Sequence, residues 1–126
     1  MKDLLPKPAK GSIFYSDTKV YACLASYPKA KGHSVVVWKK QVSDIHSLSR
    51  KDYLHLMTVV EDTRDAMRSV LGVEKVYLIY MDEAKHVHWH LVPRRKLMGF
   101  ALLNQKPKLL EDFSLAKILK EEMKKK

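Results

Sequence analysis

Three histidines occupy alternate positions in the last third of this 126-residue chain: His86, His88 and His90. Successive side chains of a β-strand point to opposite faces, so a strand over residues 85–92 would carry all three imidazoles on one face, roughly 7 Å apart. The opposite face would be apolar and would pack into the core through Val87, Trp89 and Leu91. Imidazoles titrate near neutral pH, and three of them on one face are a costly arrangement unless they perform chemistry. The spacing therefore indicates a functional strand.

Two kinds of chemistry fit three neighbouring imidazoles. The first is a metal site, because imidazole binds zinc, copper, nickel and iron, with a further ligand from His33, Asp82 or Glu83. The second is phosphoryl or nucleotidyl transfer, in which one neutral imidazole attacks phosphorus and forms a covalent intermediate. The flanking imidazoles then donate hydrogen bonds to phosphoryl oxygens or to the leaving group. The single cysteine and the lack of clustered aspartates near the strand count modestly against a metal.

The order of residue types around these histidines resembles a known signature. Residues 86–92 run histidine, apolar, histidine, apolar, histidine, apolar, apolar, which is similar to the motif of the histidine-triad family. Upstream, Pro28 is followed by the pair Gly32-His33 and then by a β-branched run, which resembles the second hallmark of that family. The resemblance covers roughly residues 12–95.

The resemblance implies an activity and a role for each histidine. Histidine-triad proteins are α+β homodimers that hydrolyse or transfer a nucleoside monophosphate from a phosphoramidate, a phosphate ester or a dinucleoside polyphosphate. By this resemblance His88 is the nucleophile, and it forms a nucleotidyl-histidine that water cleaves. His90 assists the leaving group and contacts phosphate, while His86 and His33 orient the nucleophile. A nucleotide is then the expected small-molecule substrate, and no metal or other cofactor is expected.

Two segments depart from the family pattern. An acidic or amide residue that holds the ribose commonly lies eight positions before the upstream histidine, and this chain has Ala25 there. A glycine-glutamine loop commonly precedes the triad, whereas this chain has a shorter turn over residues 81–85 that contains Asp82 and Glu83. These carboxylates would repel an anionic substrate unless they point away from it. The departures leave the nucleoside preference open and motivate an alternative, a nucleotide-binding module without catalysis.

Four further residues are candidates for binding the substrate. Lys85 and Arg94 flank the histidine strand and would supply positive charge near a phosphate, although solvated strand-end cations are an equally good interpretation. Ile13 and Leu24 are candidates for an apolar base pocket, and both also suit a core.

The elements that must position these residues follow from the apolar periodicity. Strands are expected over residues 13–15, 20–24, 33–38, 73–81 and 85–92. A long helix begins after Ser49 and stops at Gly72. Ser114 is expected to cap a last amphipathic helix. The chain is therefore expected to form one domain over residues 1–126, with its core in 12–95 and a C-terminal extension over 96–126. Its class is α+β, with a mainly antiparallel five-stranded sheet, one long helix and a C-terminal helix.

The composition narrows the functional classes. Cys23 is the single cysteine, which excludes an internal disulfide framework and an all-cysteine zinc site. No segment reaches the roughly 20 apolar residues of a membrane span, and the first residues are polar, so a cytoplasmic protein is expected. The net charge of +10 suits either an anionic partner or a solvated basic surface. No nucleic-acid-binding motif accompanies it, so binding to nucleic acid is unsupported.

Overall fold

The computed structural model describes residues 5–82, 84–95 and 99–126, without the side chain of Phe100. Along the chain the elements are β1 (Ile13–Ser16), β2 (Val20–Leu24), β3 (Ser34–Trp38), the short 3₁₀ turn η1 (Ile45–Ser47), α1 (Arg50–Leu71), β4 (Val76–Tyr80), β5 (His88–Pro93), α2 (Gly99–Leu103) and α3 (Leu115–Met123).

The five strands form one sheet in the order β1-β2-β3-β5-β4. Every neighbouring pair is antiparallel. Valine, isoleucine and tyrosine dominate β3 and β4, and such residues pack well on a pleated surface. The predicted α+β class, with a five-stranded antiparallel sheet, a long helix and a C-terminal helix, is confirmed.

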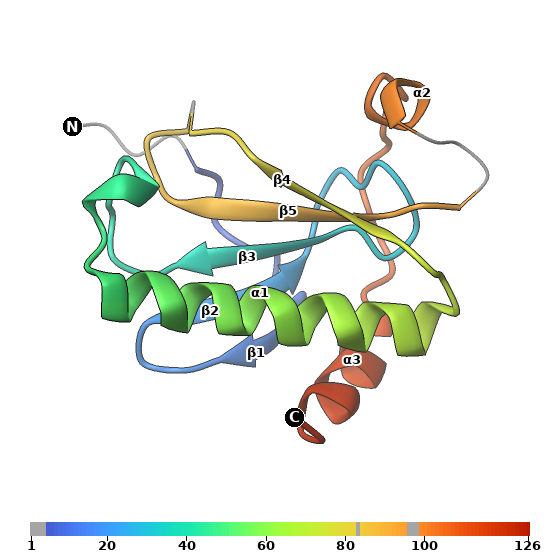
Figure 1. Cartoon of the computed structure of the whole chain (residues 1–126). Helices are drawn as coiled ribbons and strands as arrows, with labels where there is room; N and C mark the ends of the chain where they lie inside the picture. Colours follow the sequence, from blue (N-terminus) through green and yellow to red (C-terminus); the bar gives the residue numbers. More distant parts are fainter. Residues whose placement is uncertain (1–4, 83, 96–98) are drawn as a thin grey trace.

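One face of the sheet packs against α1 and α3 (Figure 1). Residues of β2 and β3 alternate between this main core and the opposite face. On β3, Val36 and Trp38 point into the main core with α1, whereas Val35 and Val37 join Cys23 and Ala25 in a smaller cluster on the other face. Cys23 is a buried free thiol. The smaller cluster marks the face that carries the site.

The signals at both ends of α1 are confirmed. Ser49 Oγ accepts a hydrogen bond from the Asp52 backbone N–H at 3.1 Å, and Gly72 ends the helix with a left-handed φ of +66°. Tyr53, in the first turn of the helix, is 41% exposed, whereas Leu56 and Val60 are buried in the main core. The helix spans 22 residues and is longer than the five-residue strands that it covers, so its ends extend beyond them.

The strand that carries the triad begins later than predicted. β5 starts at His88, and His86 lies in a bend before it. Lys85 adopts a positive φ of 59°, and this left-handed residue redirects the chain before the ladder begins. The N–H of Val87 donates to the Val42 carbonyl at 2.8 Å. The expected strand over 85–92 is therefore wrong at its start, and only two of the three histidines lie on a strand.

The C-terminal helix α3 packs on α1 and β1. Its buried residues are Ala116, Leu119 and Met123, whereas the apolar side chain of Ile118 is 55% exposed. Ser114 precedes the helix in a helical conformation and makes no side-chain cap hydrogen bond. In the part of the chain that the structure describes, no helix is long and apolar enough to cross a membrane.

Candidate active site

The pairing of β3 with β5 brings His33, His88 and His90 together. His33 directly precedes β3, and the antiparallel register places His90 opposite Val35 and His88 opposite Val37. Directly opposed residues in a ladder share a face. Both imidazoles therefore project on the side of the smaller cluster, away from α1.

A glycine holds the backbone that leads into His33. Gly32 has a φ of +95°, and a Cβ built there would lie 2.5 Å from Leu71 Cδ1. Position 32 thus needs glycine both for its backbone conformation and for its close approach to α1. The Ser34 hydroxyl donates to the Gly32 carbonyl at 2.9 Å and fixes the same turn. The glycine of the glycine-histidine pair follows from this contact with the helix.

One hydrogen-bonded series runs from the backbone through His33 to His90. The Lys29 N–H donates to His33 Nδ1 at 2.9 Å, so this nitrogen carries no proton. In the neutral ring the proton of His33 is then on Nε2, which lies 2.9 Å from His90 Nδ1 and donates to it. His90 must therefore carry its own proton on Nε2. His90 becomes a hydrogen-bond donor on the nitrogen that the series leaves open.

A second series fixes the orientation of His88. His88 Nδ1 lies 2.7 Å from the His86 carbonyl oxygen, which can only accept, so Nδ1 carries the proton. His86 Nε2 lies 2.6 Å from the Trp38 carbonyl and donates to it. The neutral His88 ring then keeps a lone pair on Nε2. This is the protonation state that an attacking imidazole needs.

Burial keeps two of the rings neutral. The burial of His33, with the nearby charges of His90 and Lys29, lowers its pKa to about 3. The burial of His90, with the charge of His88, lowers its pKa to about 4. The rings of His88 and His90 are 5.0 Å apart between centroids, and those of His33 and His90 are 5.1 Å apart. With a neutral His88, the cluster presents the lone pair of His88 Nε2 beside the N–H of His90.

An apolar cavity of about 190 Å³ adjoins His33 and His90. The sheet supplies one wall, and the N-terminal residues 5–8 supply another. The smaller cluster lines it through Cys23, Ala25, Val35 and Val37. Leu24 also lines it and is 3% exposed. No carboxylate is among its described lining residues.

Comparison with known proteins decides the family. Residues 7–97 match the model of the HIT domain, which is most of the chain. The chain belongs to the HIT family. An uncharacterized HIT-like protein of Methanocaldococcus jannaschii is 29% identical over 93 residues, covering 69% of this chain and 70% of the relative. Membership supports nucleotide binding and HIT-type activity in general terms.

Two solved structures share the fold of this HIT domain. A hypothetical histidine triad nucleotide-binding protein from Sulfolobus tokodaii has a TM-score of 0.73 at 20% identity, covering 90% of this chain and 84% of its own. A zinc-bound histidine triad family protein from Mycobacterium smegmatis has a TM-score of 0.70 at 21% identity, also covering 90% and 84%. The resemblance noted in the sequence is confirmed.

The other candidate binding residues of this HIT domain lie in different parts of the structure, and one of them lies at the cavity. Leu24 lies at the cavity, whereas Ile13 is 44% exposed on β1 and does not line it. Lys85 is exposed on the turn before His86, and Arg94 lies beyond the far end of β5. Asp82 is half-buried, and Glu83 lies outside the described residues.

The site also depends on backbone groups that the sequence pattern does not reveal. The Lys29 N–H and the Trp38 carbonyl fix the tautomers of His33 and His86. Across residues 5–82, 84–95 and 99–126 no group of three or more histidine, cysteine, aspartate or glutamate side chains is placed to hold a metal ion. The facing nitrogens of His33 and His90 are instead hydrogen-bonded to each other.

Proposed function

We propose that this HIT domain is a phosphohydrolase or nucleotidyl transferase. Its substrate would be a nucleoside phosphoramidate, a nucleoside phosphate ester or a dinucleoside polyphosphate. The observation that carries the proposal is the hydrogen bond from His88 Nδ1–H to the His86 carbonyl, because it leaves a lone pair on Nε2 of a neutral ring. Family membership supports the same chemistry.

The reaction proceeds in two steps. In the first, His88 Nε2 bonds to phosphorus, and the bond from phosphorus to the leaving group breaks. The leaving group keeps the electron pair and accepts a hydrogen bond from the His90 Nε2–H, which stays on the neutral ring, and it takes its proton from water. In the second step, water attacks the same phosphorus and the bond from phosphorus to His88 Nε2 breaks. A proton of the attacking water passes to the solvent, and nucleoside monophosphate leaves with the regenerated His88 imidazole. His33 orients His90 through its Nε2–H, and His86 orients His88 through its carbonyl.

The apolar cavity beside His33 and His90 is the proposed place of the nucleoside. Leu24 stays a candidate that borders the cavity, but its side chain packs in the main core on the other face of the sheet. Ala25 offers no side-chain acceptor to the ribose hydroxyls, so we expect little discrimination between ribose and deoxyribose. Lys85 stays a candidate for charge near the phosphate, and Ile13 stays a candidate that the cavity does not support.

The lack of a side-chain acceptor at Ala25 also favours a second function, nucleotide binding without turnover. A pocket without an acceptor for the ribose holds the substrate less firmly, and attack on phosphorus needs close alignment. The S. tokodaii neighbour is described as a nucleotide-binding protein. The two functions differ in one measurable property, the formation of a covalent adduct.

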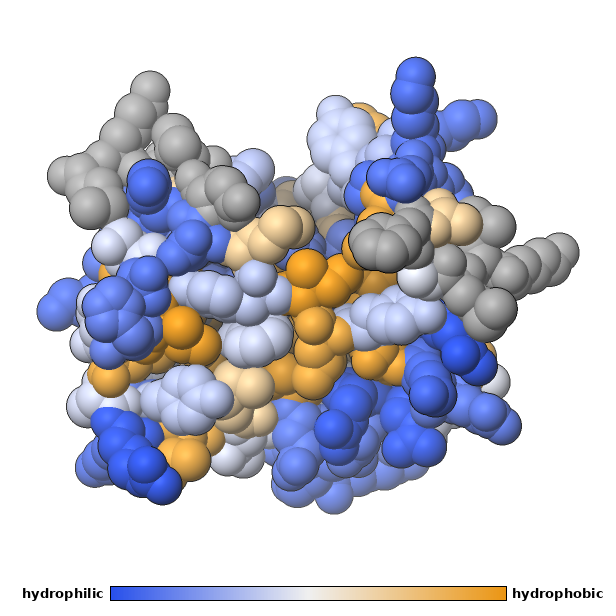
Figure 2. Space-filling model, turned by 45° about the horizontal axis from the view of Figure 1, so that its top comes forward, coloured by the Kyte–Doolittle hydropathy of each residue, from blue (hydrophilic) through white to orange (hydrophobic). Residues whose placement is uncertain are grey.

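We also propose that the chain is a homodimer that associates through β4. This strand is one of the two edges of the sheet, and an edge strand has backbone groups that can pair with another chain. Apolar side chains gather in the middle of the surface at this edge, between hydrophilic flanks (Figure 2). Leu78 is 37% exposed there. A cytoplasmic location stays a prediction.

Intact mass spectrometry after quenching tests the covalent mechanism directly. The protein is incubated with adenosine 5′-phosphoramidate and, separately, with diadenosine polyphosphates, in the presence of a metal chelator. His90→Ala is included to slow the breakdown of the adduct, and His88→Ala to remove the nucleophile. His55→Ala is the matched control, since this histidine pairs with Asp17 at 2.8 Å outside the site.

We expect an AMP-sized mass gain on His88 and release of AMP by the wild type and by His55→Ala. The adduct should accumulate in His90→Ala and be absent in His88→Ala. Nucleotide binding by calorimetry without any adduct would support the binding-only function instead. Turnover that a chelator abolishes and stoichiometric zinc restores would support the metal alternative.

A further inference from the structure

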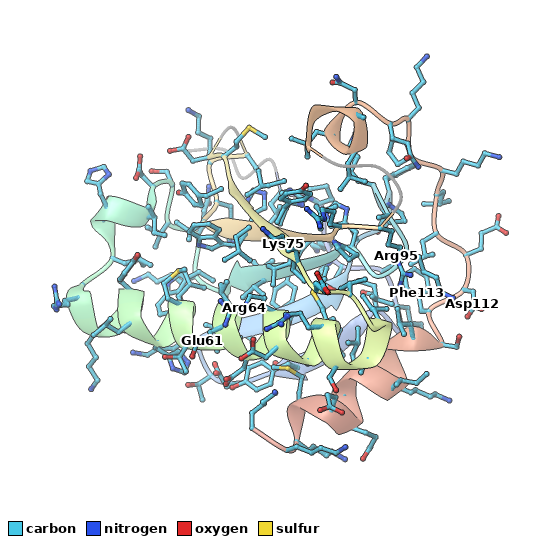
Figure 3. The ribbon with its side chains drawn as sticks, turned by 45° about the vertical axis from the view of Figure 1, so that its right-hand side comes forward. Glu61, Arg64, Lys75, Arg95, Asp112 and Phe113 are labelled. Atoms are coloured by element: carbon cyan, nitrogen blue, oxygen red, sulfur yellow. The ribbon has the colours of Figure 1, made fainter. Side chains whose placement is uncertain are left out.

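A second hollow, of about 710 Å³, lies at the end of the sheet beyond the last residue of β5. The loop between β2 and β3, the connection from α1 to β4, and α2 surround it. Figure 3 turns this end of the molecule forward and labels Lys75 and Arg95 there. Arg94 lies four residues after His90 along an extended chain, which places it ~13 Å away. The hollow shares no lining residue with the triad cavity.

Five cations line this hollow, and one carboxylate accompanies them. The cations are Lys29, Lys31, Lys75, Arg94 and Arg95, and the carboxylate is Glu74. Like charges gathered in one concavity repel each other, and their joint field attracts anions. A ligand that carries several negative charges would relieve this repulsion.

Most of these cationic side chains have no ion-pair or hydrogen-bond partner among the residues that the structure describes. In the described part of the chain, the side chains of Lys31, Lys75, Arg94 and Arg95 make no ion pair and no hydrogen bond. Lys29 Nζ donates to the Gln105 carbonyl at 3.0 Å. The guanidinium groups keep their planar set of donors, which suits bidentate contacts with phosphate.

The backbone holds two of these residues in fixed positions. The Arg94 N–H donates to the Lys75 carbonyl at 3.0 Å, directly after the paired residues Pro93 and Val76. This bond extends the β4–β5 ladder by one pair, so the two cations stand on rigid strand ends. A site built on strand ends is more precise than one on free loops.

We propose that this hollow binds a chain of linked phosphates, such as inorganic tripolyphosphate or the polyphosphate tail of a nucleotide. Five cations within one concavity match several linked negative charges better than a single phosphate. The described lining includes no aromatic ring on which a base of single-stranded nucleic acid would stack. Its apolar contribution comes instead from small or aliphatic side chains, including Leu102, which is 2% exposed. The site goes beyond the proposed function, because it needs none of the triad residues.

Calorimetric titration of the full chain with inorganic tripolyphosphate at low ionic strength tests this site. The double variant Lys75→Ala/Arg95→Ala removes two cations from the hollow. The double variant Lys117→Ala/Lys120→Ala is the matched control, because it removes the same charge from exposed positions of α3. We expect saturable binding that weakens at least tenfold in the hollow variant and less than twofold in the control. Circular dichroism checks that both variants are folded.

Two further titrations distinguish the site of binding and the class of ligand. His88→Ala should bind tripolyphosphate within twofold of the wild type, and a large loss would place the ligand at the triad and overturn the proposal. A twelve-residue oligothymidylate should bind at least tenfold more weakly than tripolyphosphate, and tighter binding would overturn the ligand class. Absence of tripolyphosphate binding, or equal losses in the two double variants, would also overturn it. None of these binding measurements requires catalysis, so a failure of this proposal is distinguishable from a failure of the proposed function.

Discussion

Replacement of Gly32 by alanine is expected to destabilise the fold through one added methyl group. The first cost is the backbone, since alanine at a φ of +95° is strained by about 1–3 kcal/mol. The second cost is steric, because the new Cβ would lie 2.5 Å from Leu71 Cδ1 and 3.1 Å from Cδ2. Such overpacking typically costs about 1–3 kcal/mol. The sum is roughly 2–6 kcal/mol, a large part of the stability of a typical domain.

Two matched variants separate these costs. Gly11 has a φ of +84° with nothing within 4 Å of a built Cβ, so Gly11→Ala should lose the backbone part alone. Leu71→Ala removes the atoms that the methyl group at position 32 would meet. In the Leu71→Ala background, Gly32→Ala should cost only the backbone part, about 1–3 kcal/mol. The double-mutant cycle therefore isolates the steric part.

Urea unfolding, followed by the fluorescence of the buried Trp38 and the partly buried Trp89, measures each free energy of unfolding. Because Gly32 directly precedes His33, AMP release should also fall in Gly32→Ala and stay near the wild-type level in Gly11→Ala. A loss of stability in Gly32→Ala that equals the loss in Gly11→Ala, within about 0.5 kcal/mol, would refute the steric reasoning. So would a penalty that is unchanged when Leu71 is alanine.

Three further predictions follow from other parts of the structure. His33 and His90 have pKa values lowered to about 3 and about 4, so below pH ~6.5 the unfolded chain binds more protons than the folded one. The free energy of unfolding should therefore fall as the pH decreases from there toward 4, by up to ~1.4 kcal/mol per pH unit for each histidine. A flat profile of urea unfolding from pH 8 to 4.5 would contradict this. Thr63 Oγ1 is buried without a hydrogen-bond partner in the described part of the chain, so Thr63→Val should raise the free energy of unfolding by about 1 kcal/mol, and an unchanged or lower melting temperature would count against it. Ser49→Ala removes the acceptor of the Asp52 N–H and should cost about 1 kcal/mol in the same urea assay, whereas a wild-type midpoint would show that the cap is dispensable.

Local patterns in the sequence were enough for much of the fold. The bounds of β2 follow directly from its apolar run, and the ends of α1 follow from Ser49 and Gly72. These features depend on residues a few positions apart, so short-range chemistry decides them. The exposure of Ile118 on α3 was not predictable in this way, because the face that a short helix buries depends on the elements that it meets.

The amino-acid sequence was enough to identify the histidines that are proposed to perform the chemistry. The alternation of His88 and His90, together with Gly32-His33, is enough to identify the histidines and the family. The face that His88 and His90 share follows from the two-residue period of a strand, which is a property of the backbone alone. That period failed at His86, because a left-handed residue one position earlier redirects the chain.

The tertiary structure alone decided what each nitrogen can do. His33 and His90 are 57 residues apart, and only the β3–β5 register places their nitrogens 2.9 Å from each other. The backbone groups of Lys29 and Trp38 then set which nitrogens carry protons. The basic hollow likewise gathers cations from separate segments of the chain. Contacts of this kind depend on the closure of long loops, and no local pattern of residues records them.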